Sequence, residues 1–489
     1  MELTVLGMVV VVVGLWIVIA GRLRHALVFL MVAALFSGSA VFHLPALGGS
    51  SIPPVQFALL FVFLRLLMPG SGMLPDVVRA IRANRWFAAF VLYGAISAYI
   101  LPRMFAGTIS VTPMRAPLTG NLFSTSPLMP TAQNFTTATY LLGALMVVIA
   151  VWSIMRRPNS ARVMVGTLAA MAWFHAVTGV AGALLRGTGA EVVFDVFRTA
   201  NYVQMNDAVG GFARIRGVLP EASAYASTGF ALFVANAELW YRSVRPSITG
   251  KAALVMGLVL VFSTSSTAYV GLAVYGLVFV GRTLALPHVA DFGKARTAVA
   301  ALAAAVFLTA ILFLVSPELI RSLVDVIKRM TIEKSSSDSS LQRMFWAMQG
   351  WEAFRHSWGL GIGAGSFRSS SILLAILGSM GVIGVVTLAM YLWGLFQPGR
   401  RSTWVATQDE SDTIGGALGV AALLSLVPAM VSSPGPVPGI LFSILAAGSL
   451  AQRPRMVEVR RVFRRSPSRN QQLAEEVLDD LRQEGLARP

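Results

Sequence analysis

Residues 371–396 read SILLAILGSMGVIGVVTLAMYLWGLF, an uncharged run that is long enough to cross a bilayer as one helix. Comparable apolar blocks recur along the 489-residue chain, of which 56% is hydrophobic and only 12% is charged. A soluble domain carries roughly twice that charged fraction. The sequence therefore predicts an all-α, polytopic integral membrane protein.

We expect about thirteen transmembrane helices, because each span needs roughly twenty apolar residues. The expected segments are 4–20, 25–42, 54–69, 86–103, 137–155, 163–185, 222–240, 252–263, 267–281, 297–316, 371–396, 413–431 and 437–451. The block 252–281 could also be a single helix, but a Ser/Thr run at 263–267 interrupts it. We favour a hairpin, since a turn at this run leaves the basic flanks Lys251 and Arg282 on the same side.

Basic residues gather in every second connection: 21–24, 70–85, 156–162, 241–251, 282–296, 397–412 and the tail from Arg453. The positive-inside rule makes this face cytoplasmic, so the N-terminus lies outside and the C-terminus inside. This bias, with attraction to membrane lipids, accounts for most of the net charge of +17 without a nucleic-acid partner. The tail turns from basic to an acidic amphipathic helix, which we interpret as a headgroup anchor; binding a regulatory partner is the alternative.

The opposite face carries the long loops 104–135, 186–221 and 317–370. Within the last loop we expect an amphipathic interfacial helix at 318–334 and a second helix at 341–355. We divide the chain into N-terminal transmembrane helices (1–135), a core that includes the loops 186–221 and 317–370 (136–396), C-terminal transmembrane helices (397–452) and a cytoplasmic tail (453–489).

Arginines in these outer loops run against the positive-inside rule and need another explanation. Arg214, Arg216 and Arg343 could clamp a lipid-linked diphosphate, because planar guanidinium groups bind phosphate oxygens in pairs and stay charged. Transfer from such a donor would also need a base, for which Glu221 and His356 are the candidates. The alternatives are ion pairs along amphipathic helices, which suit Arg321, Lys328 and Arg329 better than Arg214 and Arg216, and a helix cap for His356.

Further polar and aromatic residues accompany these arginines. Arg368, Ser369 and Ser370 would line the acceptor side, and Trp346 suits either a sugar-stacking platform or an interfacial aromatic belt. The chain has no cysteine, and its five histidines are scattered without the spacing of zinc ligands. We therefore expect no metal site and no cofactor.

Three segments of the chain carry a resemblance to a known family. Residues 214–223 read RIRGVLPEAS, a turn at 265–268 reads SSTA, and a long run leads from Arg343 through His356-Ser-Trp-Gly to Gly384. In this order, over residues 200–390, they resemble the O-antigen ligase/polymerase superfamily. The resemblance implies a GT-C-like fold in the bacterial inner membrane and glycan transfer from undecaprenyl diphosphate at the periplasmic face. It also implies site roles for Arg214, Arg343 and His356, and substrate binding at Ser265.

Departures from the ligase pattern decide between the activities of this family. Ser370-Ser371 stand where ligases place a His-Asn pair, and Ser266 stands where an Arg is common. Glu221 in its Pro-Glu-Ala-Ser setting is more similar to exopolysaccharide polymerases. We expect a glycosyltransferase that passes the growing glycan to the next lipid-linked repeat unit, with a chain-length regulator or other export components as further partners. An O-antigen ligase acting on lipid A-core is the alternative, and a flippase of the lipid-linked oligosaccharide is the alternative of another class.

Overall fold

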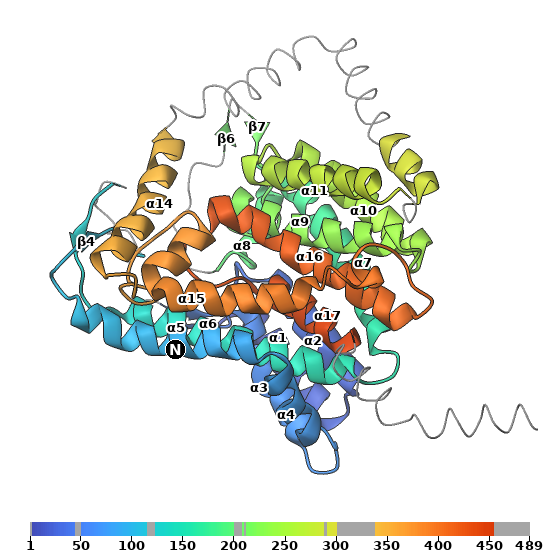
Figure 1. The fold of residues 1–489 in the computed structure, drawn as a ribbon, viewed down its shortest axis with the longest axis horizontal. Coiled ribbons are helices and arrows are strands. Elements are labelled where there is room, and N and C mark those ends of the chain that lie inside the picture. Colours follow the sequence, from blue (N-terminus) through green and yellow to red (C-terminus); the bar gives the residue numbers. More distant parts are fainter. Residues whose placement is uncertain are drawn as a thin grey trace, which may run out of the picture.

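The computed structural model describes residues 2–44, 50–114, 123–199, 208–209, 212–287, 291–300 and 338–453. Helices dominate these ranges (Figure 1). They are α1 (Val5–Ile19), α2 (Leu23–Leu35), α3 (Pro54–Leu67), α4 (Leu74–Ala83), α5 (Arg85–Met104), α6 (Ala132–Met155), α7 (Ser160–Leu184), α8 (Val192–Asp195), α9 (Ala222–Tyr241), α10 (Pro246–Phe262), α11 (Ser266–Ala285), α14 (Asp338–His356), α15 (Ile372–Phe396), α16 (Glu410–Ser432) and α17 (Ile440–Gln452), with short 3₁₀ turns η2 (Gly189–Glu191) and η4 (Arg401–Thr403).

Three small antiparallel sheets join parts of the connections. The strands β1 (Glu2–Leu3), β2 (Phe42–Leu44) and β3 (Ser50–Ile52) form one sheet, with Phe42 opposite both Leu3 and Ile52. The pairs β4 (Ser110–Val111) with β5 (Ser126–Pro127) and β6 (Ala208–Val209) with β7 (Phe212–Ala213) form the others. All three sheets are short, and they only connect neighbouring segments of the chain.

Six helices of the described part are long and apolar enough to cross a membrane: α5, α6, α7, α11, α15 and α16. The shorter helices α1, α2, α3, α10 and α17 are also apolar. A helix overlaps each expected segment whose residues are described in full; of 297–316, only 297–300 is described. The membrane character follows from these helices, whereas the count of thirteen spans stays a prediction.

Several expected boundaries were wrong. The second segment was expected to reach residue 42, but α2 ends at Leu35, and the chain turns before β2. The amide of Ala40 in that turn donates to the hydroxyl of Thr199 at 2.9 Å, and the hydroxyl of Ser39 donates to the carbonyl of Phe197. An apolar run does not by itself distinguish a helix from a buried strand, which explains the error.

The connection 70–85, expected as a plain basic loop, contains the amphipathic helix α4. Asp76 in its first turn pairs with Arg79 at 2.7 Å and with Arg157 at 3.3 Å. The helix expected at 341–355 is confirmed as α14, which begins earlier, and the expected hairpin is confirmed as α10 and α11. The amphipathic helix expected at 318–334 and the tail after Arg453 lie outside the described residues.

Helix packing builds one large apolar core, and a second, small cluster includes Ala353, Ile362 and Phe367. Helix α9 packs against α7, α10 and α16, α16 packs against α17, and α15 packs against α5 and α14. Figure 1 shows the long helices α15 and α16 running side by side, with α14 crossing their direction at one end of the bundle. We call this the α14 end.

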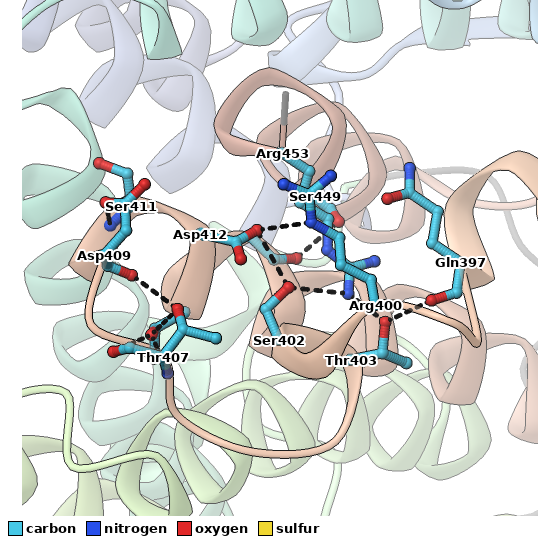
Figure 2. Close-up of polar contacts among 12 residues, drawn as sticks. Gln397, Arg400, Ser402, Thr403, Thr407, Asp409, Ser411, Asp412, Ser449 and Arg453 are labelled. Atoms are coloured by element: carbon cyan, nitrogen blue, oxygen red, sulfur yellow. Dashed lines mark hydrogen bonds and ion pairs between the residues drawn. The ribbon is translucent and has the colours of Figure 1, made fainter. Parts of the chain in front are cut away.

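A polar network closes the opposite end, which we call the Arg453 end and define by Arg400, Asp412 and Arg453. Figure 2 shows these side chains meeting around the connection between α15 and α16. Asp412 accepts hydrogen bonds from Arg400 and from the hydroxyl of Ser402, each at 3.0 Å, and Arg453 donates to the hydroxyl of Thr403. The network fixes the last described turn of the chain to this connection.

A second network near the Arg453 end is fully buried. Glu238 of α9 is paired with Arg242, one turn later, and with Arg282 of α11 at 2.9 Å. The hydroxyl of Tyr275 also donates to Glu238, at 3.0 Å. The sequence placed both arginines among solvated cytoplasmic charges, whereas each is at most 6% exposed.

Candidate functional site

The candidate site lies at the α14 end, where three separate segments of the chain converge. Glu221 is the N-cap of α9, Arg343 and Trp346 lie near the start of α14, and Arg368 belongs to the loop that leads into α15. These residues are up to 147 positions apart (368 − 221) in the sequence. The structure therefore brings Glu221 of one arginine-bearing segment near Arg343 and Arg368 of the other.

Electrostatics join these groups into one cluster. Burial lowers the pKa of the Arg343 guanidinium, and the Glu221 carboxylate opposes that shift. Burial likewise lowers the pKa of Arg368; Glu221 again opposes the shift, and Arg343 adds to it. Both arginines stay charged at neutral pH because a guanidinium starts from so high a pKa. Among the described residues, one carboxylate thus lies near two half-buried cations, so these three groups together carry a net positive charge.

Trp346 and Arg368 form the best-defined contact in the cluster. The Arg368 guanidinium carbon lies 4.4 Å from the centroid of the Trp346 ring, within the range of a cation–π interaction. The indole itself is 4% exposed. Within the described residues, the buried Nε of Arg368 has no hydrogen-bond acceptor. Trp346 therefore orients the arginine from within the fold, and it is too buried to act as an open sugar-stacking platform.

The serines expected to line the binding site of the acceptor substrate form hydrogen bonds within the protein that hold the loop in place. The hydroxyl of Ser370 donates to the backbone carbonyl of Arg343, so it ties the loop before α15 to α14. The hydroxyl of Ser369 donates to the carbonyl of Ser371, and its amide donates to Pro434. Both side chains are buried. Their observed role is to hold Arg368 next to Arg343.

The glycine-rich segment before Arg368 fixes the path of this loop. Gly359, Gly361, Gly363 and Gly365 all have positive φ angles, a region that favours glycine. A Cβ atom on Gly361 would lie 2.5 Å from the carbonyl carbon of Ser379. The motif therefore allows backbone-to-backbone packing of the loop against α15.

The loop packs against α15 at the point where that helix is interrupted. Gly381 adopts φ 57 and ψ −152, which breaks the helix. The carbonyls of Gly378 and Ser379 accept hydrogen bonds from the amides of Ile362 and Gly363 at 2.8 and 2.9 Å. Since an unsatisfied backbone group is costly in an apolar environment, the loop and the broken helix depend on each other.

Arg216, expected to hold a diphosphate, is engaged by a residue that the sequence did not single out. Its guanidinium lies 3.1 Å from Glu191, and Arg198 lies 3.9 Å from the same carboxylate. The pKa of Glu191 is held below its usual value by the amide of Gly187, followed by Arg216 and Arg198. Arg216 thus stabilises the loop 186–221.

Arg198 and Arg214 belong to the same stretch of loop. Arg198 also donates two hydrogen bonds, at 2.6 and 3.1 Å, to the carbonyl of Gly217, which has a positive φ angle and packs beside Tyr225. Arg214 is half-buried two residues before Arg216. Long-range pairs of this kind leave no spacing signal in the sequence; the shared location of Glu191 and Arg198 in one outer loop was the only hint.

Glu221 is a half-buried carboxylate at the start of α9. Its Oε2 accepts a hydrogen bond from the hydroxyl of Ser223 at 3.2 Å, and it does not cap the helix with its side chain. A carboxylate beside a pair of arginines is the kind of group that can act as a general base toward a substrate hydroxyl.

Besides Arg216, whose guanidinium pairs with Glu191, two further expected site residues are not brought to this cluster. His356 is exposed at the far end of α14, with Nε2 2.9 Å from the hydroxyl of Thr108, and it follows Arg343 by thirteen residues, or about 20 Å of helix. Its role as a base for this cluster was therefore wrong. Ser265 is buried in the turn between α10 and α11, and no hydrogen bond or ion pair of the described residues links it to Glu221 or to the arginines.

The cluster as a whole can bind an anion and accept a proton. Its two guanidinium groups offer donors for phosphate oxygens, and Glu221 offers the acceptor. Over the described ranges, no group of three or more His, Cys, Asp or Glu side chains converges as metal ligands would. A search with family models and with the sequences of curated proteins matches nothing to this chain, so the site itself carries the functional argument.

Proposed function

We propose that the protein is a membrane glycosyltransferase that polymerises a lipid-diphosphate-linked glycan. The observation that carries this proposal is the pair Arg343 and Arg368, two half-buried cations for which Glu221 is the neighbouring carboxylate within the described residues. Burial of such a charge excess is unfavourable unless an anion or polar groups balance it. The diphosphate of undecaprenyl-diphosphate-linked oligosaccharide has the matching charge, and its lipid can stay in the bilayer beside the site.

The reaction would use the two functions of the cluster together. The acceptor hydroxyl oxygen attacks the anomeric carbon of the donor glycan, and the bond from that carbon to the diphosphate oxygen breaks. The proton of the hydroxyl passes to Glu221. Arg343 and Arg368 stabilise the charge that develops on the leaving diphosphate, a contribution typical of preorganised cationic groups.

The position of the cluster at the α14 end favours a transferase over a transporter. Transporters typically place charged substrate-binding groups near the middle of the bundle. Here the arginines come from α14 and from the loop before α15, not from the interior of a long apolar helix. The proposal assigns this end to the periplasm of a bacterium, in keeping with the distribution of basic residues along the chain.

The direct test is reconstitution of the purified protein in vesicles with purified lipid-linked repeat unit, without added nucleotide sugar. We expect a ladder of polymer lengths on a gel. Arg343→Ala and Arg368→Ala should each lower the initial rate by about ten- to a hundredfold, since a charge-assisted hydrogen bond contributes about 1.5–3 kcal/mol. Glu221→Gln should abolish the ladder while donor binding persists.

Matched controls on α14 separate the site from general damage. Arg355 and His356 are exposed on the same helix, and their alanine variants should polymerise like the unmodified protein. Normal ladders from both Arg343→Ala and Arg368→Ala, at equal amounts of folded protein, would refute the proposal. Glycan transferred only to lipid A-core would identify a ligase, and translocation without any new glycosidic bond would identify a flippase.

A further inference from the structure

A groove of about 550 Å³ lies on the side of the bundle, and its lining includes none of the cluster residues Glu221, Arg343 and Arg368. It runs between α2 and α7, and the turn before α10 contributes to one end. The lining residues are Val28, Val32, Leu35, Phe36, Asn159, Arg162, Val163, Gly166, Thr167, Ala170, Met171, Phe174 and Arg245. The lining is apolar along its length and charged only at the end formed by Arg162 and Arg245.

Arg162 and Arg245 both line the groove at this turn of α7. Arg162 and Gly166 are four residues apart and so lie on the same face of the helix. A Cβ atom on Gly166 would lie 3.3 Å from Nη1 of Arg245, which places that guanidinium over the groove. Arg162 pairs with Glu410 at 2.7 Å, whereas within the described residues no hydrogen bond or ion pair engages the Arg245 guanidinium. This end of the groove therefore keeps a net positive charge.

Aromatic rings close the opposite end. Phe36 and Phe174 contact each other edge to face, with centroids 5.7 Å apart. Phe174 follows Arg162 by twelve residues, which corresponds to about 18 Å of helix. The hydrocarbon of one leaflet is about 15 Å thick, half of the usual bilayer core. The apolar part of the groove thus matches the depth of one leaflet.

We propose that this groove holds an acyl chain of an anionic phospholipid, with the lipid phosphate between Arg162 and Arg245. The charged end supplies donors for phosphate oxygens, and the apolar length covers a chain that ends within one leaflet. A long polyprenyl chain would extend beyond the Phe36–Phe174 closure. The site would bind a lipid of the leaflet on the Arg453 side. Binding of that lipid would not depend on glycan transfer.

The test is native mass spectrometry of the detergent-purified protein titrated with phosphatidylglycerol or with phosphatidylcholine of identical acyl chains. We expect one tightly retained phosphatidylglycerol and at least about tenfold weaker retention of phosphatidylcholine. Arg162→Gln and Arg245→Gln should each weaken phosphatidylglycerol binding about fivefold. Arg79→Gln, which changes an exposed ion-paired arginine outside the groove, should leave it unchanged.

A second pair of variants tests the apolar part. Ala170 and Val180 are both exposed on α7, but only Ala170 lines the groove. Ala170→Phe should weaken binding of both lipids, and Val180→Phe should weaken neither. Equal retention of the two lipids, or equal effects of the two phenylalanine variants, would overturn the proposal. Retention of undecaprenyl phosphate but not of phosphatidylglycerol would overturn it as well, and none of these outcomes depends on polymerase activity.

Discussion

Replacing Gly361 with alanine should detach the loop that carries Arg368 from α15. Gly361 has φ 85, and a left-handed backbone costs a residue with a Cβ atom about 1–2 kcal/mol. The Cβ would also lie 2.5 Å from the Ser379 backbone, so the loop must move away from the helix. That movement breaks the hydrogen bonds from Ile362 and Gly363, which contribute about 0.5–1.5 kcal/mol each. The sum is a local loss of about 2–5 kcal/mol.

The assay is hydrogen–deuterium exchange of peptides that cover residues 359–371. A loss of this size should speed exchange by about thirtyfold to three-thousandfold, since each 1.4 kcal/mol is a factor of about ten. The matched control is Gly70→Ala, because Gly70 has φ 83 but no atom within 4 Å of the added Cβ. Gly70→Ala should lose only the free energy that a left-handed backbone costs a residue with a Cβ atom. Equal exchange at 359–371 in the two variants would refute the reasoning that close packing makes Gly361 necessary.

Two further predictions concern charges away from the α14 cluster. Glu238→Gln should lower the free energy of unfolding by about 3–5 kcal/mol, because it leaves Arg242 and Arg282 buried without their counter-charge. Thermal unfolding in detergent measures this loss. Glu410→Gln, which changes an exposed ion pair, should show no comparable loss. The depressed pKa of Glu191 stabilises the folded state above its ordinary pKa of 4.5, and this contribution is lost as the pH falls below that value. Unfolding temperatures compared between pH 6 and pH 3.5 (about the range of the titration) should therefore fall less for Glu191→Gln than for the unmodified chain; an equal fall would contradict the role of Glu191.

The apolar blocks of the sequence predict most helices correctly, because burial or lipid contact of twenty consecutive residues is a strong local signal. Boundaries failed where polar residues changed the backbone path, as at Ser39, or where an amphipathic helix such as α4 followed an apolar one. Ser39 contacts Phe197, which lies 158 positions away in the sequence (197 − 39). Asp76 of α4 pairs with Arg157, which lies 81 positions away (157 − 76). No local pattern encodes such partners.

The site was predictable in part for the same physical reason. Cations on the loops that we expected to lie outside run against the positive-inside rule, and this departure singled out Arg343 and Arg216 before any contact was known. The rule cannot say which carboxylate each cation meets: Arg216 pairs with Glu191, whereas Arg343 faces Glu221. Thirteen positions along α14 separate His356 from Arg343, and the helix expected at 341–355 already implied this distance.

The break in α15 has a consequence for how the protein is made. A helix interrupted at Gly381 does not satisfy all of its own backbone hydrogen bonds, and a bilayer offers no water to replace them. Its missing partners, the amides of Ile362 and Gly363, emerge from the ribosome before α15 does. Gly363 also packs against Pro102 of α5, which is synthesised far earlier. Membrane insertion of α15 should therefore wait for a docking surface already built by α5, so that the order of translation matches the order of assembly.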